Sequence, residues 1–340
     1  MMDYPILEIV DELKIQLESH PTVLLQAPPG AGKSTVLPLL LLSADFLQGK
    51  KIIMLEPRRL AARSVAQRMA SLKGEKLGES VGYRVRFDTC ISKQTVLEVV
   101  TEGILTRMLQ NDSALDHVGL VIFDEFHERS LQADLALALC LQVQQVLRDD
   151  LRLLIMSATL DGDQLLQALG SLPVVTSSGR QYPVTLKYSN SKDNDSIALP
   201  LRISNTIRKA LRDEVGDILV FLPGAAEINK TAALLENEED ISIHLLYGDL
   251  PFQQQQAAIM PHPQGIRKIV LATSIAETSL TIEGVRVVID CGLSRVPRFD
   301  PSSGLTRLET VRVTKDAADQ RTGRAGRLGP GVCYRLWSEG

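Results

Sequence analysis

Residues 27–35, Ala-Pro-Pro-Gly-Ala-Gly-Lys-Ser-Thr, combine glycines with a lysine and two hydroxyl side chains. They follow an apolar run at 22–25 and precede an apolar stretch that predicts a helix. Glycines let backbone N–H groups turn toward an anion, and a helix N-terminus adds its positive dipole end. A chance Gly-Lys-Ser in a loop is the alternative. The flanking strand and helix favour a phosphate-binding loop made of Ala27, Pro28, Pro29, Gly30, Ala31, Gly32, Lys33, Ser34 and Thr35.

A carboxylate partner for this loop follows the apolar run 118–123, where Asp124 and Glu125 stand at the expected carboxyl end of a strand. We expect Lys33 to contact the β- and γ-phosphates of a nucleotide. The predicted metal ligands for Mg²⁺ are Ser34, Asp124 and Glu125, with Glu125 also acting as the general base for the attacking water. Adjacent acids are common in turns, so the pair supports this interpretation only together with the phosphate loop.

Three arginines at intervals of three occupy the segment 320–327, Gln-Arg-Thr-Gly-Arg-Ala-Gly-Arg. Arginine can contact a γ-phosphate with two nitrogens at once, and the small residues between would keep the surface close to a partner. A solvated, basic start of a helix is the alternative. We expect Gln320, Arg324 and Arg327 to be catalytic residues supplied by a second domain, so that hydrolysis would require the two domains to close.

Two successive α/β halves are expected to position these residues. Apolar runs alternate with helical patterns, which is typical of βαβ units around parallel sheets, and an amphipathic helix is expected over 6–17. Residues 177–180 interrupt this rhythm, so we predict domains at 1–176 and 177–340 with a hinge near 176–182. The predicted strands are 22–25, 51–55, 118–123, 152–156, 218–222, 243–246, 268–272, 285–290 and 332–336, and the clearest helices are 60–70 and 132–147.

Composition is that of a soluble globular protein large enough for two cores: 340 residues with 44% hydrophobic and 23% charged side chains. The longest apolar runs are too short to span a membrane, and the N-terminus lacks a signal-peptide pattern. The four cysteines form no CxxC pair, which is typical of reduced residues in a cytoplasmic protein. The net charge of −4 gives no indication of a nucleic-acid-binding protein, but local basic clusters can still bind a phosphate backbone.

In their order along the chain, these motifs resemble those of the superfamily-2 DEAH/DExH-box helicases. Residues 124–131 and 292–312 are most similar to bacterial members. The resemblance covers nearly the whole chain and is most specific in 272–284 followed by 320–327. The motifs are APPGAGKST (27–35), LEPRRLAARSVAQRM (55–69), TEGIL (101–105), DEFH (124–127), SAT (157–159), ILVFLPG (218–224), ATSIAETSLTIEG (272–284) and QRTGRAGR (320–327).

The resemblance implies two tandem RecA-like P-loop NTPase domains, each a parallel sheet flanked by helices, that use ATP and Mg²⁺. It implies an ATP-dependent RNA helicase motor that moves along single-stranded RNA in the 3′ to 5′ direction. Family positions imply base stacking by Arg68, nucleotide contacts by Thr281 and Glu283, contacts with the nucleic-acid backbone by Arg58, Thr101 and Thr273, and coupling between the two ligands by His127, Ser157 and Thr159.

Phe126 departs from the family pattern, because it replaces the alanine of the sequence Asp-Glu-Ala-His. The change lies outside the catalytic pair, so we expect the metal chemistry to be intact. No upstream glutamine motif that would read adenine is found, so loose nucleotide selectivity is a further hypothesis.

Two other stretches could bind nucleic acid. Residues 296–313 alternate apolar and polar side chains around Pro-Ser-Ser-Gly, which predicts a protruding β-hairpin; in the family such a hairpin separates strands or stacks on a single strand, and a structural loop is the alternative. Residues 83–87 interleave basic and aromatic side chains, which an ordinary edge strand explains equally well.

Several alternatives stay open. The motor could act on DNA, because no residue is identifiable as reading a 2′-hydroxyl. An NTP-gated switch that binds a protein without unwinding is another possibility, and a small-molecule P-loop kinase is disfavoured by the second half of the chain. We further expect a monomer without a membrane partner. Because the family's accessory C-terminal domains are absent from 340 residues, we expect ATP hydrolysis with poor unwinding.

Overall fold

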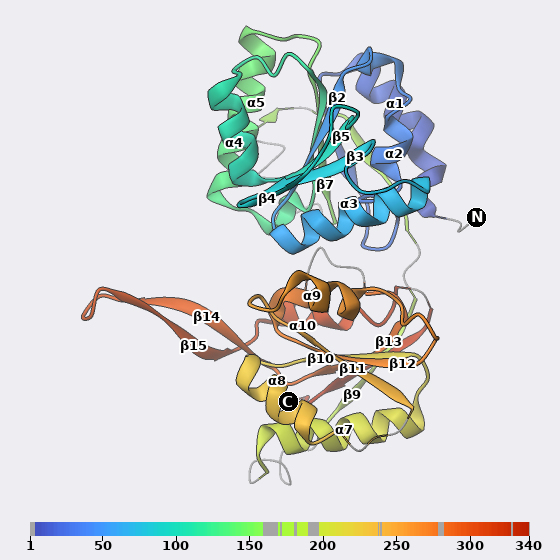
Figure 1. Ribbon diagram of the computed structural model, residues 1–340, viewed down its shortest axis with the longest axis vertical. Helices are drawn as coiled ribbons and strands as arrows, with labels where there is room; N and C mark the ends of the chain where they lie inside the picture. The colour runs from blue at the N-terminus through green and yellow to red at the C-terminus, as the bar shows by residue number, and fades with distance from the viewer. Residues whose placement is uncertain are drawn as a thin grey trace. The chain divides into compact units, whose positions relative to one another are not determined.

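Two compact units, Met1–Arg180 and Gln181–Gly340, make up the computed structural model (Figure 1). The structure describes residues 4–158, 169–170, 172–179, 182–189, 197–236, 238, 240–277, 282–327 and 329–339. The unit boundary lies four residues beyond the domain boundary predicted after position 176. The reason is local: β8 (Val174–Thr176) pairs with β1 (Thr22–Gln26), and the Ser177 N–H donates to the Gln26 carbonyl at 2.8 Å.

The first unit is built on an eight-stranded sheet with the order β4-β3-β5-β2-β6-β7-β1-β8, parallel except for the β3–β4 pair. Helices and 3-10 turns join the strands. The remaining strands are β2 (Lys51–Glu56), β3 (Val81–Val85), β4 (Asp88–Cys90), β5 (Leu97–Thr101), β6 (Val118–Phe123) and β7 (Arg152–Ser157). The helical elements are η1 (Pro5–Ile9), α1 (Val10–Ser19), α2 (Leu37–Leu41), η2 (Asp45–Leu47), α3 (Arg59–Lys73), α4 (Glu102–Asn111), η3 (Phe126–Glu128) and α5 (Leu131–Val146).

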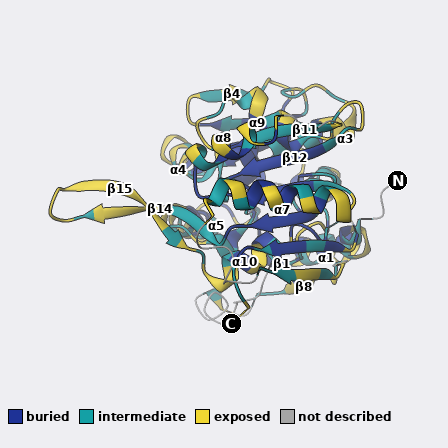
Figure 2. Ribbon diagram, turned by 90° about the horizontal axis from the view of Figure 1, so that it is seen from below, coloured by how far each residue is buried: buried dark blue, intermediate teal, exposed yellow. Residues whose placement is uncertain are grey.

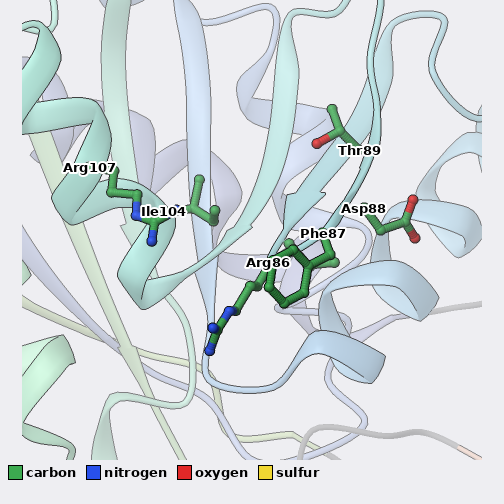
Figure 3. Close-up of a pocket in the computed structure, with 7 residues that line it drawn as sticks. Arg86, Phe87, Asp88, Thr89, Ile104 and Arg107 are labelled. Carbon is green, nitrogen blue, oxygen red and sulfur yellow. The ribbon is translucent and has the colours of Figure 1, made fainter.

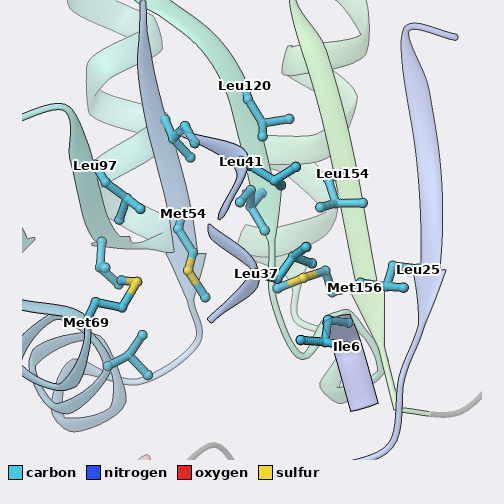
Figure 4. Packing of buried hydrophobic residues seen from close by; sticks show 14 of the residues in the cluster. Ile6, Leu25, Leu37, Leu41, Met54, Met69, Leu97, Leu120, Leu154 and Met156 are labelled. Carbon is cyan, nitrogen blue, oxygen red and sulfur yellow. The ribbon is translucent and has the colours of Figure 1, made fainter. Parts of the chain in front are cut away.

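Apolar side chains cover both faces of this sheet, because its central strands are buried along nearly their whole length. On one face Leu25, Met54 and Met156 pack with Leu37 of α2 and Met69 of α3 (Figure 4). The other face packs against α4 and α5. Because β1, β2, β6 and β7 are parallel, their carboxyl ends lie at one edge of the sheet.

Three local predictions for the first unit were wrong in detail. The helix expected over 6–17 begins as the 3-10 turn η1, whose Ile6 N–H donates to the Ala31 carbonyl at 3.0 Å. The helix after the phosphate loop begins only at Leu37, because Lys33–Val36 form a turn. The residues interpreted as an edge strand lie largely in β3, which is covered by the short strand β4 on its outer side.

The second unit has a fully parallel six-stranded sheet with the order β11-β12-β10-β13-β16-β9. Its helix α7 (Leu199–Asp213) turns one side toward the sheet and the other toward solvent (Figure 2). The strands are β9 (Val184–Tyr188), β10 (Asp217–Phe221), β11 (Ile241–Leu246), β12 (Arg267–Ala272), β13 (Val285–Asp290) and β16 (Gly331–Arg335), and the other helical elements are α8 (Ala225–Ala233), α9 (Phe252–Ile259), η5 (Ser274–Ala276) and α10 (Lys315–Thr322).

An antiparallel hairpin of β14 (Leu293–Asp300) and β15 (Leu305–Arg312) leaves this unit, as the alternation of residues 296–313 predicts (Figure 1). Most of its residues are exposed. The prediction of parallel sheets flanked by helices in both halves is confirmed. None of the helices in the described ranges is both long enough and apolar enough to cross a membrane.

Candidate nucleotide and nucleic-acid sites

The phosphate loop leaves β1 at Gln26 and is held at both ends by backbone hydrogen bonds. Ala27 N–H donates to the Ser157 carbonyl on β7 at 3.0 Å, and Ala27 is fully buried. Gly30 and Gly32 have φ values of 88° and 95°, in the left-handed region. A Cβ on Gly32 would lie 3.1 Å from side-chain atoms of Ile6 and Tyr4, so both backbone and packing require glycine there. The small residue at position 27 fits the tight turn expected from the sequence.

Lys33 lies between the two acids that the sequence singles out. Its Nζ is 2.8 Å from Glu125 Oε1 and 3.4 Å from Asp124 Oδ1, and all three side chains are buried or nearly so. The Ser34 hydroxyl hydrogen-bonds to the Asp124 carboxylate. The structure therefore brings together Lys33, Ser34, Asp124 and Glu125, which come from two segments about 90 residues apart.

Charge interactions decide how these groups are protonated. Burial disfavours the Lys33 ammonium, but the carboxylates of Asp124 and Glu125 outweigh burial and raise its pKa. Burial raises the pKa of Asp124, although Lys33 opposes the shift. The Lys33 ammonium therefore stays charged at neutral pH. An additional cation at the site would stabilise the ionised form of Asp124 further.

A third acid, Glu56, ends the neighbouring strand β2 and was not predicted as a site residue. Its side chain is 1% exposed, and neither of its carboxyl oxygens has a donor partner among the described residues. The strands bring it close to Asp124, whose N–H donates to the Leu55 carbonyl at 3.1 Å. Burial, followed by the charges of Asp124 and Glu125, raises the pKa of Glu56 well above its ordinary value. An acid directly after a buried strand is the same signal that identified Asp124.

His127 connects the acids to β7. Its Nε2 lies 3.3 Å from Glu125 Oε2, and its Nδ1 accepts a hydrogen bond from the Ala158 N–H at 3.4 Å. Ser157 is buried at the end of β7, beside the start of the phosphate loop. His127 and Ser157 thus lie near Glu125 and the phosphate loop, their coupling role stays a prediction, and Thr159 lies outside the described residues.

Phe126, the departure from the family pattern, is buried against the core of the first unit. Its ring packs edge-on against Phe123 with centroids 6.0 Å apart, and the Arg129 guanidinium lies 5.5 Å from its centroid. The larger side chain thus contributes to the core under α5.

The residues expected to contact nucleic acid in the first unit lie at the starts of α3 and α4, the helices that follow the neighbouring strands β2 and β5. Arg58 is the N-cap residue of α3, and Thr101 is the N-cap residue of α4. Arg58 forms an ion pair with Glu128 at 3.3 Å, which the sequence did not predict. Arg68 lies half-buried on α3.

A shallow hollow of about 470 Å³ lies beside the β3–β4 turn (Figure 3). Arg86 and Phe87 form the turn, and the Arg86 guanidinium lies 4.7 Å from the Phe87 ring centroid. Arg107 and Ile104 of α4 contribute to the same hollow (Figure 3). The exposed aromatic ring beside two arginines is suited to stacking on a base near a phosphate.

In the second unit, the first of the three arginines is not available as a finger. Arg321 is 0% exposed, donates to Asp290 Oδ1 at 2.6 Å and to Glu277 Oε1 at 2.7 Å, and lies 4.8 Å from the Phe221 ring centroid. Arg321 was not among the predicted catalytic residues, and its burial shows that equal spacing does not give the three arginines the same surroundings. Arg324 is buried and donates to the Glu277 carbonyl.

The other predicted residues of this unit do not lie at one end of the sheet, because Thr273 follows the carboxyl end of β12, whereas Glu283 precedes the amino end of the parallel strand β13. Gln320 is exposed on α10, and Arg327 is half-buried. Thr273 follows β12 and donates its N–H to the Leu246 carbonyl at 3.1 Å. Glu283 is half-buried in the turn before β13, whereas Thr281 lies outside the described residues.

Comparison with known proteins matches both halves of the chain. The family described as DEAD/DEAH box helicase matches residues 10–168, and the helicase conserved C-terminal domain matches residues 202–329. The sequence is 55% identical over 99% of its length to the ATP-dependent RNA helicase HrpB of Escherichia coli, of which it covers 41%. It is 36% identical over 98% of its length to the ATP-dependent RNA helicase HrpA of Borreliella burgdorferi, of which it also covers 41%.

A solved structure supports the same conclusion. The crystal structure of the Escherichia coli DEAH/RHA helicase HrpB matches with a TM-score of 0.90 and 54% identity, over 99% of this chain and 43% of that one. This chain thus spans about two-fifths of the length of its relatives. The resemblance drawn from the sequence motifs is confirmed.

Proposed function

Because this chain belongs to the DEAD/DEAH box helicase family, we propose that it is the ATP-hydrolysing motor of an RNA helicase. The observation that carries the proposal is the buried contact of Lys33 with Asp124 and Glu125 behind a glycine-rich loop. On nucleotide binding, Lys33 turns from Glu125 to the phosphates, which leaves the Glu125 carboxylate able to take a proton from water. His127, in contact with Glu125, holds the carboxylate in place.

The residues at this site fit Mg²⁺. Asp124 Oδ2 is buried without a hydrogen-bond partner, and the Ser34 hydroxyl lies beside the same carboxylate. Among the described residues no group of three or more His, Cys, Asp or Glu is arranged to hold a metal ion, so phosphate and water oxygens would complete the six ligands. Ser34 and Asp124 would hold the ion, with Glu125 near its water shell, and the ion would neutralise charge on the β- and γ-phosphates.

The second unit would supply the remaining positive charge. We propose that Arg324 and Arg327 contact the γ-phosphate, that Gln320 orients the attacking water, and that Thr281 and Glu283 face the nucleotide. Arg68 would stack on the base, and the hinge would lie near 176–182. Closure of the units around ATP would then make hydrolysis depend on their movement.

The proposed substrate is single-stranded RNA, as the names of the relatives suggest, with movement from 3′ to 5′. Arg58, Thr101 and Thr273 would contact its phosphates, and the β14–β15 hairpin would meet the strand. Contacts of this kind are independent of sequence and weaken with salt. His127, Ser157 and Thr159 would transmit the state of the nucleotide to this path.

The decisive experiment measures ATP hydrolysis while matched RNA or DNA strands are titrated, with Glu125→Gln as the inactive control. We expect RNA to stimulate turnover more than DNA does. Stimulation by DNA alone would favour a DNA translocase. Hydrolysis indifferent to both would favour an NTP-gated switch that binds a protein. Parallel assays with ATP and GTP test the proposed loose nucleotide selectivity.

A further inference from the structure

Arg58 is held by an internal carboxylate at the point where the proposed function needs it to meet a phosphate. Its Nη2 lies 3.3 Å from Glu128 Oε2. The Arg58 side chain is 35% exposed, whereas Glu128 is 17% exposed. A phosphate in solution can therefore reach the guanidinium, while the carboxylate is mostly covered by protein.

Glu128 belongs to the loop that carries the proposed general base. The Glu128 N–H donates to the Glu125 carbonyl at 2.9 Å, across the 3-10 turn η3. Glu125 and Arg129, at the two ends of this turn, both have left-handed backbones, with φ of 49° and 43°. Non-glycine residues adopt this region only where the surroundings hold them there. The pair with Arg58 is one such constraint on the loop.

A second acid, Glu102, lies near Glu128 and opposes its negative charge. Glu102, the first residue of α4, accepts a hydrogen bond from the Ser130 hydroxyl at 2.7 Å and interacts electrostatically with Glu128. Asp134 pairs with Arg129 at 2.9 Å. Glu102, Glu128 and Arg58 line one small cavity of about 160 Å³ that also reaches Glu125. Arg58 is the cation that forms an ion pair with Glu128, at 3.3 Å.

We propose that Glu128 is an internal competitor for Arg58, so that a backbone phosphate of the nucleic acid displaces its carboxylate and thereby acts on the loop of Glu125. The inference rests on the proposed function. Carboxylate and phosphate bind a guanidinium with the same geometry, so one can replace the other without moving α3. Glu128 is then a positioning residue, which acts on hydrolysis through Glu125 and on nucleic-acid binding through Arg58.

The test compares Glu128→Gln with Asp134→Asn, because each removes the negative charge from one ion pair with an arginine, Glu128 in η3 and Asp134 in the first turn of α5. RNA affinity and the RNA concentration for half-maximal ATP hydrolysis are measured for both. Glu128→Gln should bind RNA about fivefold more tightly and lower the half-maximal concentration to a similar degree, the range expected for a partly exposed ion pair. Asp134→Asn should change either quantity by less than about twofold.

Arg58→Gln completes a double-mutant cycle. If Glu128 competes for Arg58, the loss of RNA affinity caused by Arg58→Gln is larger in the Glu128→Gln background than in the wild type. Additive effects, or equal effects of Glu128→Gln and Asp134→Asn, would overturn the inference while leaving the proposed function intact. A wild-type protein that binds no RNA would overturn both. Unfolding curves of each variant establish that the comparison is between folded proteins, and a weaker RNA affinity of a folded Glu128→Gln variant would also refute competition.

Discussion

Replacing Arg321 with methionine should destabilise the second unit strongly. Methionine is also a long, unbranched side chain, so the main loss is that of the guanidinium charge and its hydrogen bonds. Arg321 and Asp290 are both 0% exposed, and Glu277 completes the network. Without the guanidinium, a fully buried carboxylate loses its cation. Removing one partner of a buried ion pair costs about 3–5 kcal/mol, and loss of the contact with Phe221 adds to this.

Urea unfolding followed by fluorescence measures this loss, because Trp337 is the only tryptophan in the sequence and its ring packs against Gly292, two residues beyond Asp290. With a slope of about 2 kcal/mol per molar urea, a loss of about 4 kcal/mol lowers the midpoint by about 2 M. Arg298→Met is the matched control, since its pair with Glu309 is 71% and 49% exposed and is worth at most about 1 kcal/mol.

A triple variant separates charge from packing. If stranded carboxylates cause the loss, adding Asp290→Asn and Glu277→Gln to Arg321→Met should recover much of the stability. The reasoning is refuted if Arg321→Met shifts the midpoint no more than Arg298→Met does. It is also refuted if the triple variant is less stable than the single one.

Three further predictions concern the first unit. Glu125→Gln should reduce ATP turnover by about 10²–10⁴-fold while nucleotide binding persists, and parallel turnover and binding assays check this; near-normal turnover would exclude Glu125 as the base. Glu56→Gln should raise stability by about 1–3 kcal/mol in urea unfolding without nucleotide, because a neutral amide replaces an acid whose charge is opposed by burial and by Asp124 and Glu125; a loss of stability would contradict this. Hydrogen bonds from Arg148, and then from Lys50, hold the pKa of Asp150 well below its ordinary value of 3.8, so its contribution is present above that pH and is lost as the pH falls below it. Asp150→Asn should therefore cost about 1 kcal/mol at pH 7, discounted for partial exposure, and less at pH 3; a cost independent of pH would contradict the assignment.

Much of the fold could be predicted because buried parallel strands have a strong signature. The strands 118–123 and 285–290 were predicted with the bounds that the structure gives, and the hairpin was predicted from its alternation. Residues next to such strands, including Asp124 and Glu125, could be placed at the carboxyl edge for the same reason. The pairing of Lys33 with both acids follows from the β1-β7-β6 order, which no local pattern contains.

The features that escaped prediction depend on long-range neighbours. Glu56 resembles any acid at the end of a strand until β2 is known to lie beside β6. Arg321 has the same spacing as Arg324 and Arg327, and only the packing of α10 against β13 distinguishes it as buried. Glu128 lies in a motif whose family pattern drew attention to Asp124, Glu125 and His127 instead.

The β14–β15 hairpin is a long arm whose base is held by the charged contacts of Arg321. Each strand has eight residues, so the tip lies about 26 Å from the base at roughly 3.3 Å per residue. A tilt of about 5° at the base would sweep the tip through about 2 Å, more than half the rise of one residue. The carbonyl of Leu293, where β14 begins, accepts a hydrogen bond from Arg321, and so does the carboxylate of Asp290, three residues before it. The buried guanidinium of Arg321 thus holds residues 290–293, which set the angle of the hairpin. A small displacement of α10 would therefore produce a larger displacement at the hairpin tip.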